Sequence, residues 1–149
     1  MKRLLLIAVA ALLAAAGPAS AGERPPWATV NFCDTARHPA EIGIRAALPQ
    51  RRGRVATVRY RVQYRDLSDG RWRYVRAADS GWRRVRATET GWTFEVAGSG
   101  TRILRGVVFY RWSRHGTVAR RARRVTEGGH RSTVGADPDG FSAATCRID

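Results

Sequence analysis

Apolar and polar residues alternate with a period of two along most of the chain, and the clearest run covers residues 54–67. Side chains two positions apart in a β-strand point to the same face, so this alternation predicts a strand with one buried side. One face carries Val58, Tyr60, Val62 and Tyr64, and the other carries Arg59, Arg61, Gln63 and Arg65. Shorter runs with the same pattern predict further strands at 27–32, 41–48, 72–76, 82–87, 92–97, 103–112 and 117–126.

Turn residues separate these runs. Residues 66–70, Asp-Leu-Ser-Asp-Gly, are expected to form a hairpin turn because glycine supplies the positive φ that such turns need. Residues 113–116 are expected to form another turn. From residue 22 onward, no stretch of the chain shows the 3.6-residue period of a helix. About seven or eight short strands predict an all-β protein, an antiparallel β-sandwich. Residues 128–149, rich in Gly, Asp and Ser, are expected to form a coil-rich tail.

The N-terminus has the pattern of a cleaved secretion signal. Met1-Lys2-Arg3 is followed by thirteen apolar residues, and residues 19–21, Ala-Ser-Ala, form the small-x-small pattern at which signal peptidase cuts. The alternative, a membrane anchor, needs about 20 apolar residues. We therefore expect a cleaved signal helix at 1–21, a single domain at 22–149, and a secreted or extracytoplasmic protein without a membrane span in its mature chain.

The mature chain is strongly basic. Residues 22–149 hold 25 basic and 12 acidic side chains, a net charge of +13, and Lys2 is the only lysine of the whole chain. A GC-rich genome favours arginine codons over lysine codons, which explains the missing lysine. Codon usage does not explain the excess of basic over acidic residues. That excess either attracts polyanions or keeps an exported domain soluble.

Two cysteines, Cys33 and Cys146, lie near opposite ends of the mature chain. In an oxidising compartment an even pair indicates a disulfide. Closing a loop of more than 100 residues would stabilise the fold by roughly 4–5 kcal/mol in the chain-entropy model. The alternative, a reactive catalytic thiol, needs a free sulfur and a histidine partner, and the second cysteine argues against the free sulfur.

Arginines cluster on the predicted strands. If the strands near residues 60, 108 and 122 belong to one sheet, Arg59, Arg61, Arg111 and part of the cluster at 120–124 share a solvent face. Guanidinium groups offer paired N–H donors to phosphate, sulfate or carboxylate oxygens. The sequence therefore predicts a polyanion-binding site for an anionic cell-surface polymer or polysaccharide, with nucleic acid less favoured; a merely solvated sheet face is the alternative. The candidate residues are Arg59, Arg61, Arg65, Arg111, Arg120, Arg121, Arg123 and Arg124.

The last two predicted strands resemble the end of a fibronectin type III or immunoglobulin-like domain. The similarity rests on residues 104–112 (LRGVVFYRW), a turn at Gly116, and residues 124–126 (RVT). Those families usually carry a tyrosine at the position of Leu104, and the cysteine pair lies outside the strands that carry the antibody disulfide. The chain is also similar to small exported proteins of GC-rich bacteria through residues 30–35 and 128–131. The resemblance implies a non-catalytic sandwich used for binding, spacing or display, although a fold alone does not define a function.

Two further groups of residues are candidates for ligand binding. The tryptophans would form a carbohydrate-stacking platform if they lay side by side, but packing is their more common role; they are Trp27, Trp72, Trp82, Trp92 and Trp112. Residues 137–140, Asp-Pro-Asp-Gly, have the carboxylate spacing of part of a calcium loop but lack its other ligands, so a turn is expected. The three histidines are scattered, and no metal site or cofactor is expected.

Catalytic motifs are missing from the sequence: it contains no Gly-x-Ser-x-Gly, His-Glu-x-x-His, P-loop or dinucleotide fingerprint. Glu89 and Glu95 are candidates for paired carboxylates, but neighbouring arginines would lower their pKa, which does not suit a general acid. We expect a monomeric, non-catalytic domain with a structural, adhesive or binding role, with electrostatic binding of extracellular polyanions as the alternative. A third possibility is a minor hydrolase, or an inhibitor that presents a loop such as 113–117.

Overall fold

The computed structural model describes residues 24–96, 98 and 100–149, and the predicted signal helix at 1–21 lies outside these ranges. The described chain is all-β, with nine strands and no helix. Within these ranges, therefore, no helix is long and apolar enough to cross a membrane. The prediction of an all-β protein is confirmed.

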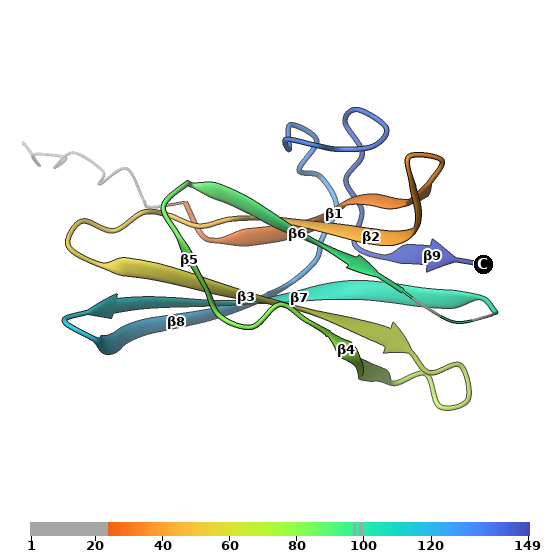
Figure 1. Ribbon diagram of the computed structural model, residues 1–149, viewed down its shortest axis with the longest axis horizontal. Helices are drawn as coiled ribbons and strands as arrows, with labels where there is room; N and C mark the ends of the chain where they lie inside the picture. Colours follow the sequence, from red (N-terminus) through yellow and green to blue (C-terminus); the bar gives the residue numbers. More distant parts are fainter. Residues whose placement is uncertain (1–23, 97, 99) are drawn as a thin grey trace, which may run out of the picture.

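The strands form two antiparallel sheets that lie one above the other (Figure 1). The small sheet has the order β1 (Trp27–Thr35), β2 (His38–Ala47) and β6 (Glu89–Glu95). The large sheet has the order β4 (Trp72–Asp79), β3 (Val55–Arg65), β7 (Arg102–Arg114) and β8 (Thr117–Val125). Two short strands extend the large sheet: β5 (Arg83–Val85) pairs with β3, and β9 (Cys146–Ile148) pairs with β7. Two layers of this kind agree with the predicted β-sandwich.

The large sheet is built around the long pair β3 and β7, which are in register from Val55 opposite Ser113 to Tyr64 opposite Leu104. A two-residue turn at His115 and Gly116 then leads into β8, and both residues have positive φ. Turns of this type match the twist of the strands that they join. Since β3, β7 and β8 are neighbours, the strands near residues 60, 108 and 122 do belong to one sheet, as predicted.

The core lies between the sheets, on the inner faces that the alternation predicts. The inner side chains of β2 and β3 are almost completely buried; they include Ile42, Ile44, Ala46, Val58, Tyr60 and Val62. Tyr110 and Trp112 of β7 add two large rings, stacked 6.0 Å apart. The Tyr110 hydroxyl donates to the carbonyl of Trp27 (2.7 Å), and Trp112 Nε1 donates to the carbonyl of Pro49 (3.0 Å). Both bonds tie β7 to the same end of the β1–β2 pair, where Trp27 is opposite Ala47.

A β-bulge in β1 decides which way Cys33 points. Val30 pairs with Ile44 but Phe32 pairs with Gly43, so one residue of β1 is extra. An extra residue shifts the alternation of side chains. Cys33 therefore lies opposite the inward-facing Ile42, whereas Phe32 covers Gly43 on the outer face. Glycine is needed at position 43 because a Cβ atom there would overlap the Phe32 ring.

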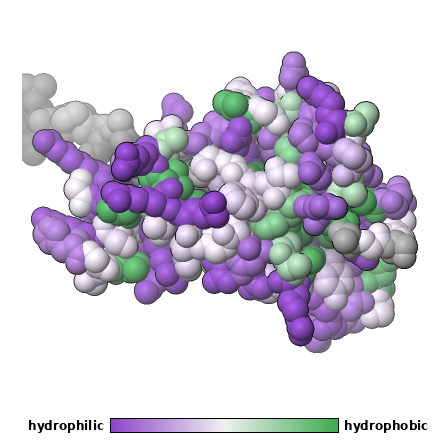
Figure 2. Space-filling view, in the orientation of Figure 1, coloured by the Kyte–Doolittle hydropathy of each residue, from purple (hydrophilic) through white to green (hydrophobic). Residues whose placement is uncertain are grey.

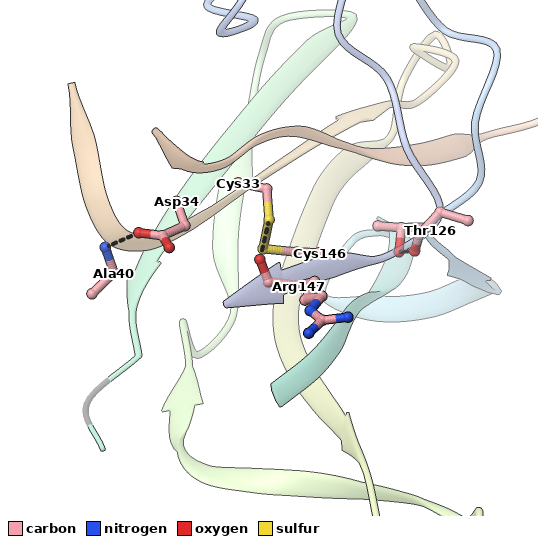
Figure 3. The surroundings of a disulfide bond; sticks show 7 residues. Cys33, Asp34, Ala40, Thr126, Cys146 and Arg147 are labelled. Carbon is pink, nitrogen blue, oxygen red and sulfur yellow. Dashed lines mark hydrogen bonds between the residues drawn. A yellow bond between two sulfur atoms is a disulfide. The ribbon is translucent and has the colours of Figure 1, made fainter. Parts of the chain in front are cut away.

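The predicted disulfide is confirmed. Cys33 of β1 is bonded to Cys146 of β9, and their Cα atoms are 5.3 Å apart (Figure 3). β9 pairs with the beginning of β7, where Leu104 is opposite Cys146. The bond therefore joins the small sheet to the large sheet across a sequence separation of 113 residues.

Two features differ from the sequence prediction. The tail is not coil throughout, because Cys146–Ile148 form β9. Its composition could not reveal this strand, since the hydrogen bonds that create it go to a strand far away in the sequence. The strands predicted at 82–87 and 92–97 also have other bounds. β6 begins at Glu89, where its pairing with Ala47 starts, and β5 is only three residues long.

Candidate functional site

Charge is divided unequally between the two sheets. The strands β3, β4, β7 and β8 hold thirteen arginines and one carboxylate, Asp79. The three strands of the small sheet hold one arginine, Arg45, and four carboxylates. On the side seen in Figure 2, hydrophilic residues predominate and hydrophobic ones form small separate patches. The distinctive feature of this surface is therefore the basic charge that gathers on one layer of the sandwich.

The outer face of the large sheet brings together most of the arginines that the sequence singles out. Register places Arg111 opposite Arg121, and it places Phe109 between Arg59 and Arg123. Arg61 and Arg65 share this side because alternate residues of a strand point the same way. We call this surface the arginine face; it consists of Arg59, Arg61, Arg65, Arg105, Arg111, Arg121 and Arg123.

Two arginines of the predicted site belong to the opposite side of β8. Arg120 is opposite Trp112 and Arg124 is opposite Val108, and both partners face the core. Alternation therefore turns Arg120 and Arg124 away from the arginine face. Arg124 donates from Nε to the carbonyl of Pro26 (2.8 Å) instead. Of the four candidates at 120–124, only Arg121 and Arg123 therefore lie on the arginine face, which agrees with the expectation that part of this cluster shares it.

Four arginines of the face contact aromatic rings, and three of them stack closely; the fourth, Arg123, lies 5.9 Å from the centroid of the Phe109 ring. The guanidinium carbon of Arg111 lies 3.6 Å from the centroid of the Trp82 ring. The corresponding distances are 3.8 Å for Arg61 over Tyr74 and 4.1 Å for Arg105 over Trp72. Such a contact is worth about 0.5–1 kcal/mol at an exposed site. Stacking restricts these side chains, so the face presents guanidinium groups in defined positions rather than on freely moving stems.

One carboxylate offsets part of this charge. Asp79 pairs with Arg59 and, at 3.3 Å, with Arg61. The hydrogen bond from Arg59 is the main reason that the pKa of Asp79 falls to about 2. The rest of the face lacks such compensation: among the described residues, no carboxylate pairs with Arg105, Arg111, Arg121 or Arg123.

Arg105 is the member of the face that sequence reasoning missed. Its Nε donates to the side-chain oxygen of Gln63 (2.9 Å). Burial is the main reason that the pKa of Arg105 is lowered, and the nearby charge of Arg123 lowers it further. The signal was present in the sequence, because Arg105 and Arg111 are six positions apart on a strand of period two.

The arginine side chains also cover apolar surface. Val107 is completely buried, yet it lies outside the core between the sheets. Its neighbours across the sheet are Arg61 and Val125. Long arginine stems pack well on such a residue while their charged ends stay in water. The face is therefore a packed layer with a cationic surface.

The C-terminal tail closes the outer face of the small sheet. Val30 and Ala143 exchange two backbone hydrogen bonds (2.9 and 3.0 Å), and Figure 1 shows the tail loops on the side away from the large sheet. Arg45 donates from Nε to the carbonyl of Val134 (2.7 Å) and lies 3.4 Å from the carboxylate of Glu89. A hollow of about 560 Å³ remains on this side. Arg45 lines it, but its charge is already engaged.

The five tryptophans, all of them described, do not form a common platform. Trp112 is in the core, Trp27 stacks on His130 at 4.1 Å, and Trp92 lies under Arg83 at 4.0 Å. Only Trp72 and Trp82 border the arginine face, and each contacts a guanidinium group there. The interpretation of these residues as packing elements therefore fits better than a shared sugar platform.

The other candidate sites are also dispersed. Glu89 and Glu95 stand at opposite ends of β6. The carboxylate of Asp137 is engaged by Arg37 and Thr35. A turn is present here, one residue further along than predicted, since the backbone of residue 141 donates to the carbonyl of residue 138 (2.9 Å) and closes a turn over 138–141. Between β7 and β8 only residues 115 and 116 form the connection, so 113–117 is a tight turn. In the part of the chain that is described, no group of three or more potential ligands could hold a metal ion.

The arginine face is thus the candidate ligand-binding site that the fold assembles, within the described residues, from most of its predicted members. Comparisons of the chain with family models, with curated proteins and with solved structures give no match.

Proposed function

We propose that the protein is an exported, non-catalytic domain that binds acidic polymers through the arginine face. The mature chain from residue 22 would act outside the cytoplasm as a monomer. The disulfide supports this location because such bonds persist in oxidising compartments. The favoured ligand is an acidic polysaccharide or another anionic polymer of a cell surface.

The proposal includes a sandwich of the immunoglobulin or fibronectin type III kind. Its support is the order of the strands, β1-β2-β6 against β4-β3-β7-β8, with connections that cross between the sheets. Domains of this architecture serve many cell-surface proteins. The chain departs from the families at Leu104, which is fully buried and has no hydroxyl. A different tyrosine joins the two layers here, because the Tyr110 hydroxyl of the large sheet donates to the Trp27 carbonyl of the small sheet.

The observation that carries the proposal is the contrast between the two sheets in arginine and carboxylate content. The ratio of arginine to carboxylate is thirteen to one on the four long strands of the large sheet and one to four on the small sheet. Codon usage replaces lysine with arginine on every surface alike, and charge that serves solubility needs no particular face. Binding of a polyanion, by contrast, requires that the positive charge be concentrated on one face.

The spacing of the arginines suits a polymer. Alternate residues of a strand are about 6.7 Å apart and neighbouring strands are about 4.8 Å apart. A flat array with this spacing meets several sulfate, carboxylate or phosphate groups of one chain at once. Each guanidinium can donate two parallel hydrogen bonds to such a group. Release of counterions would make the binding strongly dependent on salt.

The test compares two double variants that lose the same charge. Arg121→Gln/Arg123→Gln removes two exposed arginines from the face, and Arg86→Gln/Arg131→Gln removes two exposed arginines from elsewhere. We expect the face variant to elute from heparin at lower salt than the unmodified protein. With duplex DNA as a probe, its slope of log K against log salt should become less negative by about 2, because each phosphate contact contributes about 0.9.

The control variant should elute close to the unmodified protein. Equal elution of the two variants would contradict the proposal, since retention would then follow total charge and not the arginine face. Circular dichroism of both variants would show that the fold is retained.

A further inference from the structure

A hollow of about 530 Å³ lies at one end of the arginine face, between the β3–β4 hairpin and the residues Val96, Thr101 and Arg102. Arg65 belongs both to the face and to the wall of the hollow. The apolar part of the wall consists of Tyr64, Leu67, Tyr74, Val75 and Val96. The hollow is therefore continuous with the surface that we propose to bind polymers, but it has a different chemistry.

Two of its wall residues are unusually exposed for apolar side chains. Leu67 is 70% exposed and Tyr74 is 37% exposed. Tyr74 also stacks on Arg61, so the same ring borders the arginine face and the hollow. Exposed apolar residues that gather in a concave, partly polar site are typical of ligand binding. Arg61 covers one side of the Tyr74 ring, whereas packing leaves most of Leu67 exposed.

The charge of the hollow is positive. Arg65, Arg76 and Arg102 line it, together with one carboxylate, Asp66. Asp66 is already engaged, because it accepts hydrogen bonds from Ser68 (2.6 Å) and Arg73 (2.8 Å). These bonds lower the pKa of Asp66, those from Ser68 most. The described residues provide no carboxylate partner for Arg65 or Arg76. An apolar wall thus adjoins uncompensated cations.

We propose that this hollow binds one acidic sugar residue, a uronate or a sulfated hexose, of a polymer lying on the arginine face. The proposal rests on the proposed function of that face. A pyranose ring has a surface of C–H groups that packs on aromatic and aliphatic side chains. Its carboxylate or sulfate accepts paired hydrogen bonds from guanidinium groups. The hollow supplies both kinds of partner in one place.

A nucleotide is the competing ligand, and the wall suits it less well. Proteins recognise a single base by stacking and by hydrogen bonds to its edges. Apart from the arginines and the tyrosine hydroxyls, the polar side chains of the wall are Thr101 and the engaged Asp66. Arg61 already occupies one side of the Tyr74 ring. The hollow therefore favours an anionic group beside an apolar surface over a flat base with specific edges.

The experiment is a titration of the purified protein, followed by the NMR signals of its backbone amides. The probes are a sulfated uronate disaccharide from chondroitin sulfate, glucose, and thymidine monophosphate. We expect the disaccharide to shift the amides of Leu67, Val75 and Val96, and to bind at least tenfold more tightly than either other probe. Leu67→Ser should weaken disaccharide binding at least fivefold.

Val134→Ser is the matched control, because Val134 is 69% exposed and lies on the C-terminal tail, away from the hollow. It should leave the affinity for the disaccharide unchanged. Equal effects of the two serine variants, or tighter binding of the nucleotide, would overturn the sugar site even if heparin retention still depended on Arg121 and Arg123. Loss of that dependence would instead contradict the proposed function of the face.

Discussion

The small and large sheets bury their alternate apolar residues against one core, but their outer faces differ. On the small sheet, the single arginine is held by Glu89 and by the carbonyl of Val134 in the tail. On the large sheet, arginines lie on aromatic rings, and Asp79 is the only carboxylate of the four long strands. Arginine therefore has two uses in this protein. It fastens the tail to one layer and leaves the charge of the other layer available to a ligand.

The two sheets also differ in how many N–H groups their arginines leave available to a ligand. A side chain such as Arg45 has its hydrogen bonds satisfied within the protein, so it has little left to offer a polyanion. A guanidinium stacked on a ring still has its N–H groups along its edges. This is the physical reason to look for function on the large sheet, and the following changes test the contrast.

The largest effect is expected when the two sheets are no longer joined. Cys33→Ser/Cys146→Ser should lower the free energy of unfolding by roughly 4–5 kcal/mol, because the open chain regains the entropy that a loop of this length loses. Urea denaturation measures the change. Thiol titration of the unmodified protein should find no reactive cysteine. A loss of less than about 1 kcal/mol would mean that strand pairing alone holds β9 in place.

A second change tests how tightly the outer face of the small sheet is packed. Gly43→Ala places a methyl group where the Phe32 ring lies, so it should destabilise the fold by roughly 1–3 kcal/mol. Thr93→Ala is the control, since Thr93 is the exposed residue opposite Gly43 on β6. Thermal unfolding compares the two. Heparin elution of Gly43→Ala should stay unchanged below its melting temperature, because the arginine face lies on the other sheet.

Asp79→Asn tests the charge balance of the large sheet. Without this carboxylate, Arg59 and Arg61 become available, so heparin binding should strengthen about threefold, in line with the ~0.5–1 kcal/mol of an exposed ion pair. Glu95→Gln removes one carboxylate from the small sheet and is the control. If both variants bind heparin equally well, net charge rather than position determines the affinity.

The same aspartate should produce a defined pH dependence of stability. Its pKa is about 2 in the fold, below the ordinary value of 3.8. A lowered pKa means that the ionised form stabilises the fold. The contribution, about 1 kcal/mol for a partly exposed group, is complete above pH 3.8 and disappears as the pH falls toward 2. Unfolding curves of the unmodified protein and Asp79→Asn should therefore differ at pH 6 and converge near pH 2.

The smallest expected effect distinguishes arginine from lysine. Arg111→Lys keeps the charge but loses the flat contact with Trp82, so it should lower the free energy of unfolding by about 0.5–1 kcal/mol. Arg121→Lys, an exposed position with no ring contact described, should change it much less. Tryptophan fluorescence would report the altered surroundings of Trp82. Equal stability of the two variants would leave codon usage as the reason for arginine at position 111.

Much of the fold was visible in the sequence because one-sided burial imposes a period of two. Val58, Tyr60 and Val62 are in the core as their alternation with arginine predicts. The bulge in β1 was not visible, since it depends on Phe32 lying over Gly43 of the neighbouring strand. The strand at Cys146 was missed for the same reason: three residues have no detectable period, and their partners are residues 102–104 at the beginning of β7.

The sequence predicted that the candidate site is a cationic face, but it did not predict correctly which residues form that face. Arginines on β3, β7 and β8 indicated a cationic face, and six of the seven residues that form it were among those predicted. Arg120 and Arg124 were included because they are close in sequence, although they point the other way. The ring contacts of Arg61, Arg105 and Arg111 were beyond prediction, because each joins strands whose register is set by the whole sheet.

The sequence by itself determined the all-β class, the pairing of its only two cysteines and the excess of arginine, since these follow from periodicity and composition. Only the tertiary structure decided that the excess lies on one sheet, that rings and a few aspartates hold part of it, and that a hollow with exposed Leu67 and Tyr74 adjoins it. Periodicity assigns a residue to one of two sides of its own strand. Which residues of other strands share that side depends on register and sheet order, and these are set by contacts between segments far apart in the chain.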